Sequence, residues 1–202
     1  TDNDFNGMVN ADGQNITLAD STDGFTLGDV TATGTLDATS TDGPIDQAAG
    51  TAIRVDGNTS ITARSGSNPP SDYDITLNGA DNSFGANVSA RGRDVTLAAS
   101  SGLRVDVLAS GDLSLRSGGT TLLENIVVGG DMSIVSRDDI LTVGEVVVFG
   151  VTDATSVNGR VVGVGEPYYR SLVPQNQLPG AGGSVSGSSA PGSASERAVI
   201  IR

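Results

Sequence analysis

A long segment near the N-terminus of this chain recurs later in the sequence without a gap. DNDFNGMVNADGQNITLA, which begins at Asp2, aligns with DNSFGANVSARGRDVTLA, which begins at Asp81, an offset of 79 residues. Nine aligned positions are identical, among them Phe5 with Phe84. An internal repeat of this length without helical periodicity is typical of a solenoid or another repeat array.

The similarity between the two copies continues with small shifts in register. IRVDGNTSI, from Ile53, is similar to IVVGGDMSI, from Ile126. Residues 1–63 and 81–137 are therefore interpreted as two copies of one unit, with 64–80 between them.

A shorter period lies inside these copies, in the form Asp–apolar–Thr/Ser–apolar. DITL begins at Asp74, DVTL at Asp94, DLSL at Asp112 and DMSI at Asp131, which gives spacings of 20, 18 and 19 residues. A rung of about 20 residues fits two or three short strands joined by tight corners. A hairpin meander is the alternative, but its turns recur every 8–12 residues or so. The period therefore favours an all-β fold, a right-handed parallel β-helix (β-solenoid).

In such a rung, alternate side chains point inward and like side chains stack from rung to rung. We expect two apolar columns: Ile75, Val95, Leu113 and Met132 in one, and Leu77, Leu97, Leu115 and Ile134 in the other. Glycine is expected to supply the positive-φ corners, and three glycines recur at nearly the same offset before successive strands: Gly92, Gly111 and Gly130.

The solenoid is predicted to cover residues 1–165, with longer loops at 39–50 and 64–73. Pro69 and Pro70 favour the second loop, because proline cannot donate to a β-ladder. The apolar stretch 139–164 is either the last rung or two, or a strand buried on both sides.

Residues 166–202 form a Gly/Ser/Pro-rich tail with the composition of a linker. It contains the pair Tyr168 and Tyr169, which could anchor a subunit interface or pack against the solenoid end. It is expected to be extended and to end in a short strand, AVIIR from Ala198, suited to pairing with an open sheet edge. The residues predicted for an assembly interface are Tyr168, Tyr169, Val199, Ile200 and Ile201.

Composition excludes several classes of function. The chain has no Cys, which excludes disulfides, and no His, the commonest general base and metal ligand. Its formal charge of −13 argues against nucleic acid and against anionic membranes as partners. No apolar stretch is long enough for a membrane span, so membrane insertion is not expected. The chain starts at Thr1 and is interpreted as a processed product or a fragment.

The pattern DITLNGADNSFGANVSARGRDVTLAASSGLRV, followed by VGGDMSIVSRDDI, resembles the repeats of filamentous-haemagglutinin-like adhesins. The resemblance covers roughly residues 1–150 and does not extend to the tail or to a secretion domain. It implies two-partner secretion from a Gram-negative bacterium and a β-helix on the cell surface.

Acidic clusters are candidates for a hard cation such as Ca²⁺, which takes several oxygen ligands. They are TDND at Thr1, SDYD at Ser71 and SRDDI at Ser136, but tandem glycine-rich calcium repeats are absent. Solvated corner residues are the favoured interpretation, so no metal or cofactor is assigned.

A carbohydrate-active enzyme would need converging carboxylates. The available ones are Asp72, Asp74, Asp94, Asp138 and Asp139, with Arg91 and Arg93 as candidate ligands for an acidic sugar. They form no paired motif, so no catalytic residue is assigned and an enzyme is not expected.

Three functions follow from these observations. The favoured one is an extracellular structural protein, a segment of a bacterial surface fibre that stacks end to end with copies of itself, with its tail contacting a neighbour. The alternative is an adhesin stalk that binds surface glycans. A β-helical polysaccharide-active enzyme is the third.

Overall fold

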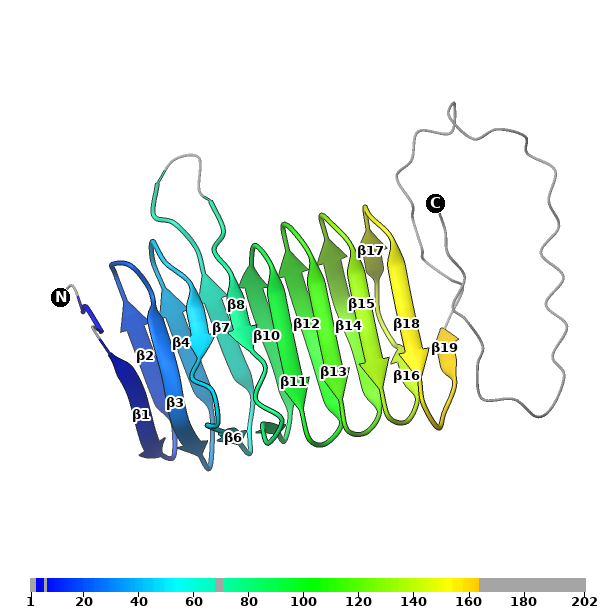
Figure 1. Cartoon of the computed structure of the whole chain (residues 1–202), viewed down its shortest axis with the longest axis horizontal. Coiled ribbons are helices and arrows are strands. Elements are labelled where there is room, and N and C mark those ends of the chain that lie inside the picture. Colours follow the sequence, from blue (N-terminus) through cyan, green and yellow to red (C-terminus); the bar gives the residue numbers. More distant parts are fainter. Residues whose placement is uncertain (1–2, 6, 68–70, 164–202) are drawn as a thin grey trace, which may run out of the picture.

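The computed structural model describes residues 3–5, 7–67 and 71–163. In these residues the chain winds into a β-solenoid of about eight turns, drawn as two stacked layers of strands in Figure 1. The described residues contain no helix, so none is long and apolar enough to cross a membrane. The predicted all-β solenoid is confirmed.

Each turn, called a rung below, contributes strands to two sheets whose pairs are all parallel. The ten-stranded sheet contains β1 (Met8–Gly13), β3 (Phe25–Ala32), β5 (Ile45–Gln47), β6 (Ile53–Val55), β8 (Ile75–Leu77), β9 (Ser83–Phe84), β11 (Val95–Ala99), β13 (Leu113–Ser117), β15 (Met132–Ser136) and β18 (Thr152–Ser156). The nine-stranded sheet contains β2 (Ile16–Asp20), β4 (Leu36–Ser40), β7 (Thr59–Ala63), β10 (Asn87–Gly92), β12 (Leu103–Ala109), β14 (Thr121–Val128), β16 (Ile140–Thr142), β17 (Val146–Val148) and β19 (Val161–Gly163).

The core is the narrow space between the two sheets, filled by the inward side chains of successive rungs. Both predicted columns exist in the predicted register: Ile75, Val95, Leu113 and Met132, and Leu77, Leu97, Leu115 and Ile134. All eight side chains are buried. Aliphatic residues fill most of this narrow space, and the core also contains Phe25 and Phe84.

One polar pair interrupts this apolar core. Gln47 and Asn82 exchange two side-chain hydrogen bonds of 2.8 Å, each amide donating once and accepting once. Asn82 is fully buried, and its Oδ1 also accepts from the backbone N–H of Ile53 at 2.8 Å. The pair links the bends that follow β5 and β8. The irregular backbone of these bends leaves polar groups that need hydrogen-bond partners.

The two predicted loops have different outcomes. The prediction of a loop at 39–50 is wrong. This stretch contains the end of β4 and all of β5, and only a short bend follows. The described residues of the second loop, 64–67 and 71–73, do leave the rod between β7 and β8 (Figure 1), and an antiparallel bridge joins Arg64 to Asp72 at the base of the loop.

The apolar stretch at 139–164 forms the last two rungs through β16, β17, β18 and β19. A strand buried on both sides is not observed among them, since Leu141 and Val147 are only half-buried and Asp153 is exposed. The tail from residue 166 onward, including Tyr168, Tyr169, Val199, Ile200 and Ile201, lies outside the described residues.

The two copies of the sequence unit do not occupy equivalent places in the rod. β2 and β11 are aligned by the 79-residue offset, but β2 belongs to the nine-stranded sheet and β11 to the ten-stranded sheet. β1 and β10 are exchanged in the same way. The long strands of the rungs also change sheet: β3 lies in the ten-stranded sheet, whereas β12 and β14 lie in the nine-stranded sheet. The unit therefore does not span a whole number of turns, and its second copy faces the opposite side.

Candidate functional site on the ten-stranded sheet

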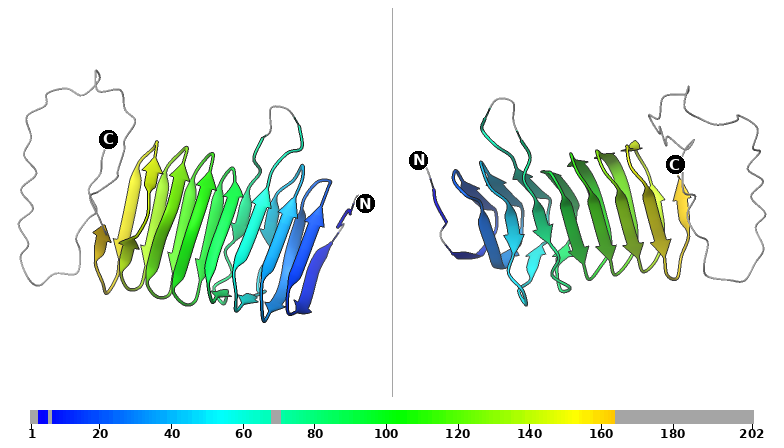
Figure 2. Two further views of the ribbon diagram at one scale, coloured as in Figure 1. Left: turned by 180° about the vertical axis from the view of Figure 1, so that it is seen from behind. Right: turned by 45° about the horizontal axis from the view of Figure 1, so that its top comes forward.

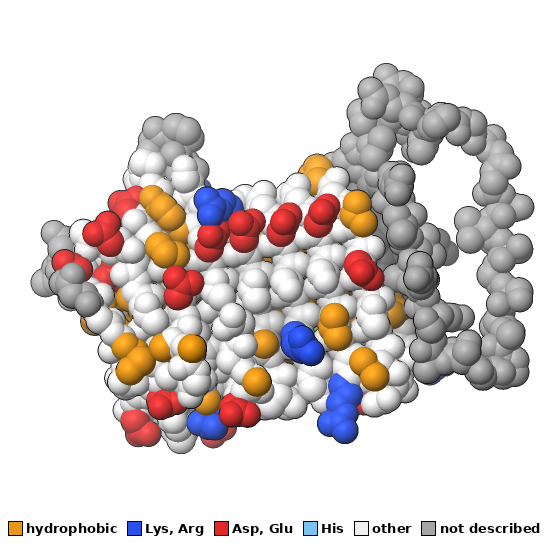
Figure 3. Space-filling view, in the orientation of Figure 1, with side chains coloured by type: hydrophobic (Ala, Val, Ile, Leu, Met, Phe, Trp, Pro, Cys, Tyr) orange, Lys and Arg blue, Asp and Glu red, His pale blue; other side chains and the backbone are white. Residues whose placement is uncertain are grey.

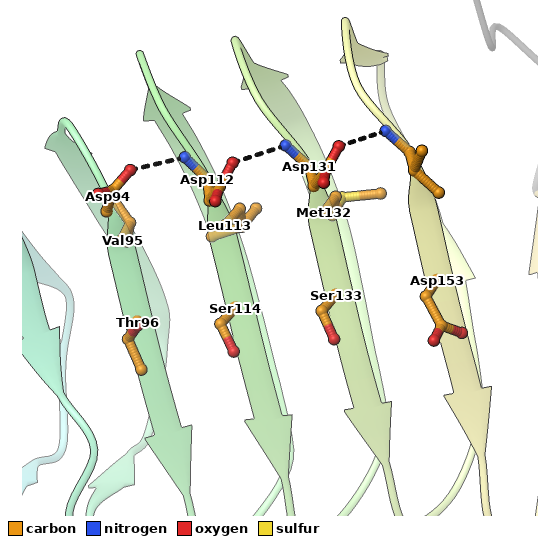
Figure 4. A pocket seen from close by; sticks show the side chains of 11 residues that line it. Asp94, Val95, Thr96, Asp112, Leu113, Ser114, Asp131, Met132, Ser133 and Asp153 are labelled. Atoms are coloured by element: carbon orange, nitrogen blue, oxygen red, sulfur yellow. Dashed lines mark hydrogen bonds between the residues drawn. The ribbon is translucent and has the colours of Figure 1, made fainter. Parts of the chain in front are cut away.

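A row of aspartates runs along the ten-stranded sheet, one residue before each strand. Oδ1 of Asp94 accepts a hydrogen bond from the backbone N–H of Asp112 at 2.9 Å. Asp112 accepts from Asp131 at 2.8 Å, and Asp131 from Val151 at 2.7 Å, as Figure 4 shows. Each carboxylate therefore satisfies a corner N–H of the following rung.

Gly111 and Gly130 directly precede Asp112 and Asp131, and both must be glycine because the neighbouring rung lies too close for a Cβ. A Cβ on Gly111 would collide with Oδ1 of Asp94, and a Cβ on Gly130 with Oδ1 of Asp112. Neither glycine, nor Gly92, has a positive φ, so the expected reason for glycine at these three corners is wrong. In two successive rungs, the Gly-Asp dipeptides at 111–112 and 130–131 instead make room for one carboxylate and supply the next.

Beside the aspartates lies a row of outward side chains that carry oxygen. Thr76, Thr96, Ser114, Ser133 and Asp153 follow one another through the strand register. Asp94, Asp112 and Asp131 line a shallow groove of about 370 Å³ together with Thr96, Ser114, Ser133 and Asp153. Figure 3 shows this face, with its acidic side chains in a line.

Arg93 neutralises one end of the aspartate row. Its guanidinium donates to both carboxylate oxygens of Asp74, at 2.7 and 2.6 Å, and lies 3.6 Å from Asp94. The hydrogen bond and the charge of Asp74 raise the pKa of Arg93 above its ordinary value. Arg93 therefore remains cationic here, and no ion pair with Asp112 or Asp131 is present among the described residues.

Asp72 lies apart from this row, at the base of the 64–73 loop. Its Oδ1 is 3.6 Å from Nε of Arg64 and 3.7 Å from Nε of Arg91, and its side chain is 13% exposed. Two guanidinium groups around one carboxylate attach the loop to the rod and oppose binding of a cation there.

Asp138 and Asp139 occupy a different corner, between β15 and β16. Oδ1 of Asp139 accepts from the backbone N–H of Arg160 at 2.7 Å, and the backbone carbonyl of Asp138 accepts from Ser156 at 2.6 Å. The structure therefore does not bring the candidate carboxylates together as a catalytic set. Among the residues it describes, no three acidic side chains are grouped to hold a metal ion.

Sequence reasoning assigned corner positions to Asp74 and Asp94 and gave Asp112 and Asp131 no role beyond the strand motif. The Gly-Asp dipeptides at 111–112 and 130–131 are the signal for their shared role as acceptors. The arrangement combines hydroxyls and carboxylates repeated at the rung spacing of about 4.8 Å. Chemically, it can hydrogen-bond a polar surface or polymer along the rod.

Comparison with known proteins finds similarity to one family, described as repeats of unknown function (DUF5649), over residues 13–91. The matched stretch is 79 residues long, the same as the offset between the two copies, and runs from the end of β1 into β10. No curated protein and no solved structure matches the chain.

Proposed function

We propose that this chain is a rod-forming segment of an extracellular structural protein that extends a fibre on a bacterial cell surface. The observation that carries the proposal is the parallel ladder, which continues from rung to rung with β1 and β2 at one end and β18 and β19 at the other. Parallel strands at the end of a sheet present backbone groups that can pair with a further rung.

The composition of the rod supports the same role. The acidic surface favours solubility of a long particle, and the chain has no cysteine, so the rod forms without disulfides. The carboxylates of Asp94, Asp112 and Asp131 accept hydrogen bonds from the next rung and so add to its cohesion, which suits a mechanical element.

Fibre growth in this proposal occurs by end-to-end stacking of β-solenoids, which is a heterologous contact and gives open filaments. The apolar terminal residues Val199, Ile200 and Ile201 are the segment suited to pair with a neighbour's open edge. The resemblance to filamentous-haemagglutinin-like adhesins is consistent with this role, and so is an extracellular location.

Electron microscopy of the full chain at micromolar concentration tests the proposal. Uniform filaments whose axial rise is a multiple of about 4.8 Å are expected. Replacing Val199, Ile200 and Ile201 with serine is expected to abolish filaments while leaving the strand-rich circular dichroism spectrum unchanged. Short rods that never associate would refute end-to-end assembly.

A second candidate, an adhesin stalk that binds surface glycans, is favoured by the groove of hydroxyl and carboxylate side chains on the ten-stranded sheet. It predicts discrete rods with measurable binding to a glycan panel, and binding that falls when Ser114 and Ser133 are replaced by alanine. Absence of binding across neutral and acidic glycans would exclude this candidate.

A further inference from the structure

The outer face of the nine-stranded sheet changes character along the rod. One outward row begins with Ala19, runs through Thr39, Thr62 and Arg91, and continues as Leu108, Val127 and Val147. A second row begins with Arg104 and continues as Leu122, Leu141 and Val162. The face is therefore polar in the early rungs and apolar in the last ones, on the side of the molecule seen from behind in Figure 2.

These apolar side chains have no partner inside the rod, because they point away from the core. In β14, Leu123, Ile126 and Val128 are buried, whereas Val127 is 38% exposed. Leu108, one rung earlier, is 36% exposed, and Val143, at the bend between β16 and β17, is 45% exposed. Leu122, Leu141, Val147 and Val162 are half-buried, and apolar side chains exposed on neighbouring rungs mark an interaction surface. The C-terminal apolar face is defined as Leu108, Leu122, Val127, Leu141, Val147 and Val162.

We propose that residues 167–173 of the same chain, PYYRSLV, cover the C-terminal apolar face. Val162 belongs to this face and is followed directly by Gly163, the last described residue. An extended chain of five residues from Gly163 to Tyr168 reaches about 17 Å. The row from Leu122 to Val162 spans two rung intervals, about 10 Å. The two tyrosines can therefore reach every part of the row without displacing a strand.

The size of the face selects a short segment over a second copy of the chain. Four rungs of about 4.8 Å, crossed by strands of about 20–25 Å, give roughly 400 Å². A stable protein dimer buries about 800 Å² on each partner. Two tyrosines bury about 150–250 Å² each, so 167–173 alone has enough surface to cover this face.

Charge complementarity fixes the orientation of the segment. Glu145 lies at the exposed bend between β16 and β17, beside Val143, and has no ion pair among the described residues. Of the other acidic residues near the face, Glu124 is already paired with Arg104, and Asp106 accepts a hydrogen bond from Asn125. Arg170, which directly follows the two tyrosines in the sequence, is the matching cation for Glu145.

The absence of tryptophan makes tyrosine fluorescence a direct readout, because the chain has only three tyrosines. In a Tyr73→Phe background, the signal comes from Tyr168 and Tyr169 alone. We expect acrylamide to quench this fluorescence weakly in the full chain. Leu122→Asp combined with Leu141→Asp should raise quenching several-fold, and the control Ser114→Asp, on the opposite sheet, should leave it unchanged.

A charge exchange tests the same contact without altering the apolar face. Arg170→Glu alone should increase quenching, and adding Glu145→Arg should restore protection. Strong quenching in the parent protein, or equal quenching in all variants, would overturn the proposal. Protection that disappears on dilution would also overturn it, because the cover would then be a second copy.

Discussion

Oδ1 of Asp112 lies 2.8 Å from the backbone nitrogen of Asp131, one rung away along the rod. Asp112 also donates its own N–H to Asp94, so it is both acceptor and donor in one continuous row. The row places negative charges about 4.8 Å apart along its length. The hydrogen bonds between successive rungs therefore offset the repulsion between neighbouring carboxylates.

Replacing Asp112 with asparagine separates these two effects. The Asp112→Asn change would keep the acceptor oxygen and remove the charge between Asp94 and Asp131, so we expect the free energy of unfolding to rise by about 0.5 kcal/mol. Asp112→Ala should lower it by about 1 kcal/mol, since the N–H of Asp131 loses its acceptor. Urea denaturation of both variants measures the difference. The gain from asparagine should shrink with added NaCl, and equal losses in both variants would contradict this account.

The same corner predicts the effect of a methyl group at Gly130. Gly130→Ala is expected to lower stability by about 1–3 kcal/mol, because its Cβ meets Oδ1 of Asp112 and lies 3.0 Å from the backbone of Gly111. Gly7→Ala is the matched control, since no atom lies within 4 Å of the added Cβ. Thermal unfolding of the two variants should differ clearly, and similar midpoints would argue against close approach as the reason for glycine.

A buried hydroxyl gives a prediction of opposite sign. Thr121 is fully buried in a column between Leu103 and Ile140, and its Oγ1 has no hydrogen-bond partner among the described residues. Thr121→Val should raise the free energy of unfolding by about 1 kcal/mol, because an unpaired buried polar group is removed at constant shape. Thr96→Val, on the outward face, serves as the control with little expected change. A destabilised Thr121→Val protein would indicate that a bound water satisfies the hydroxyl.

The amide pair in the core should show strong coupling. Gln47→Ala and Asn82→Ala each leave the other amide without its partner, so each is expected to cost about 2–4 kcal/mol. The double variant should cost less than the sum of the two, with a coupling energy of about 1–3 kcal/mol. Additive losses, measured by urea denaturation, would show that the two side chains act independently.

Much of the fold was predictable because a rung is a local pattern. The strand motif beginning at Asp74, Asp94, Asp112 and Asp131 gave the correct register of both apolar columns. Stacking like residues on like residues leaves few alternatives once the spacing is known.

What was missed depends on contacts between rungs, which no local pattern specifies. The 39–50 stretch, which contains Gly43, Pro44 and Gly50, was predicted to be a loop, although Phe25 pairs with Ile45 in the ladder. The role of Gly111 and Gly130 was also missed, because it comes from an aspartate in the preceding rung. In the candidate site, Asp72 was identified as an acidic residue, but Arg64 and Arg91 approach it only in the folded chain.

Because β2 and β11 lie in different sheets, the repeated sequence unit does not coincide with the structural repeat of the rod. A recombination event that deletes one copy would join matching sequence to matching sequence and leave a rod of paired strands. Every surface beyond the junction would nevertheless turn to the other side. A lineage that gains or loses single copies would therefore change which side of its rod a distal surface faces, without any substitution in that surface.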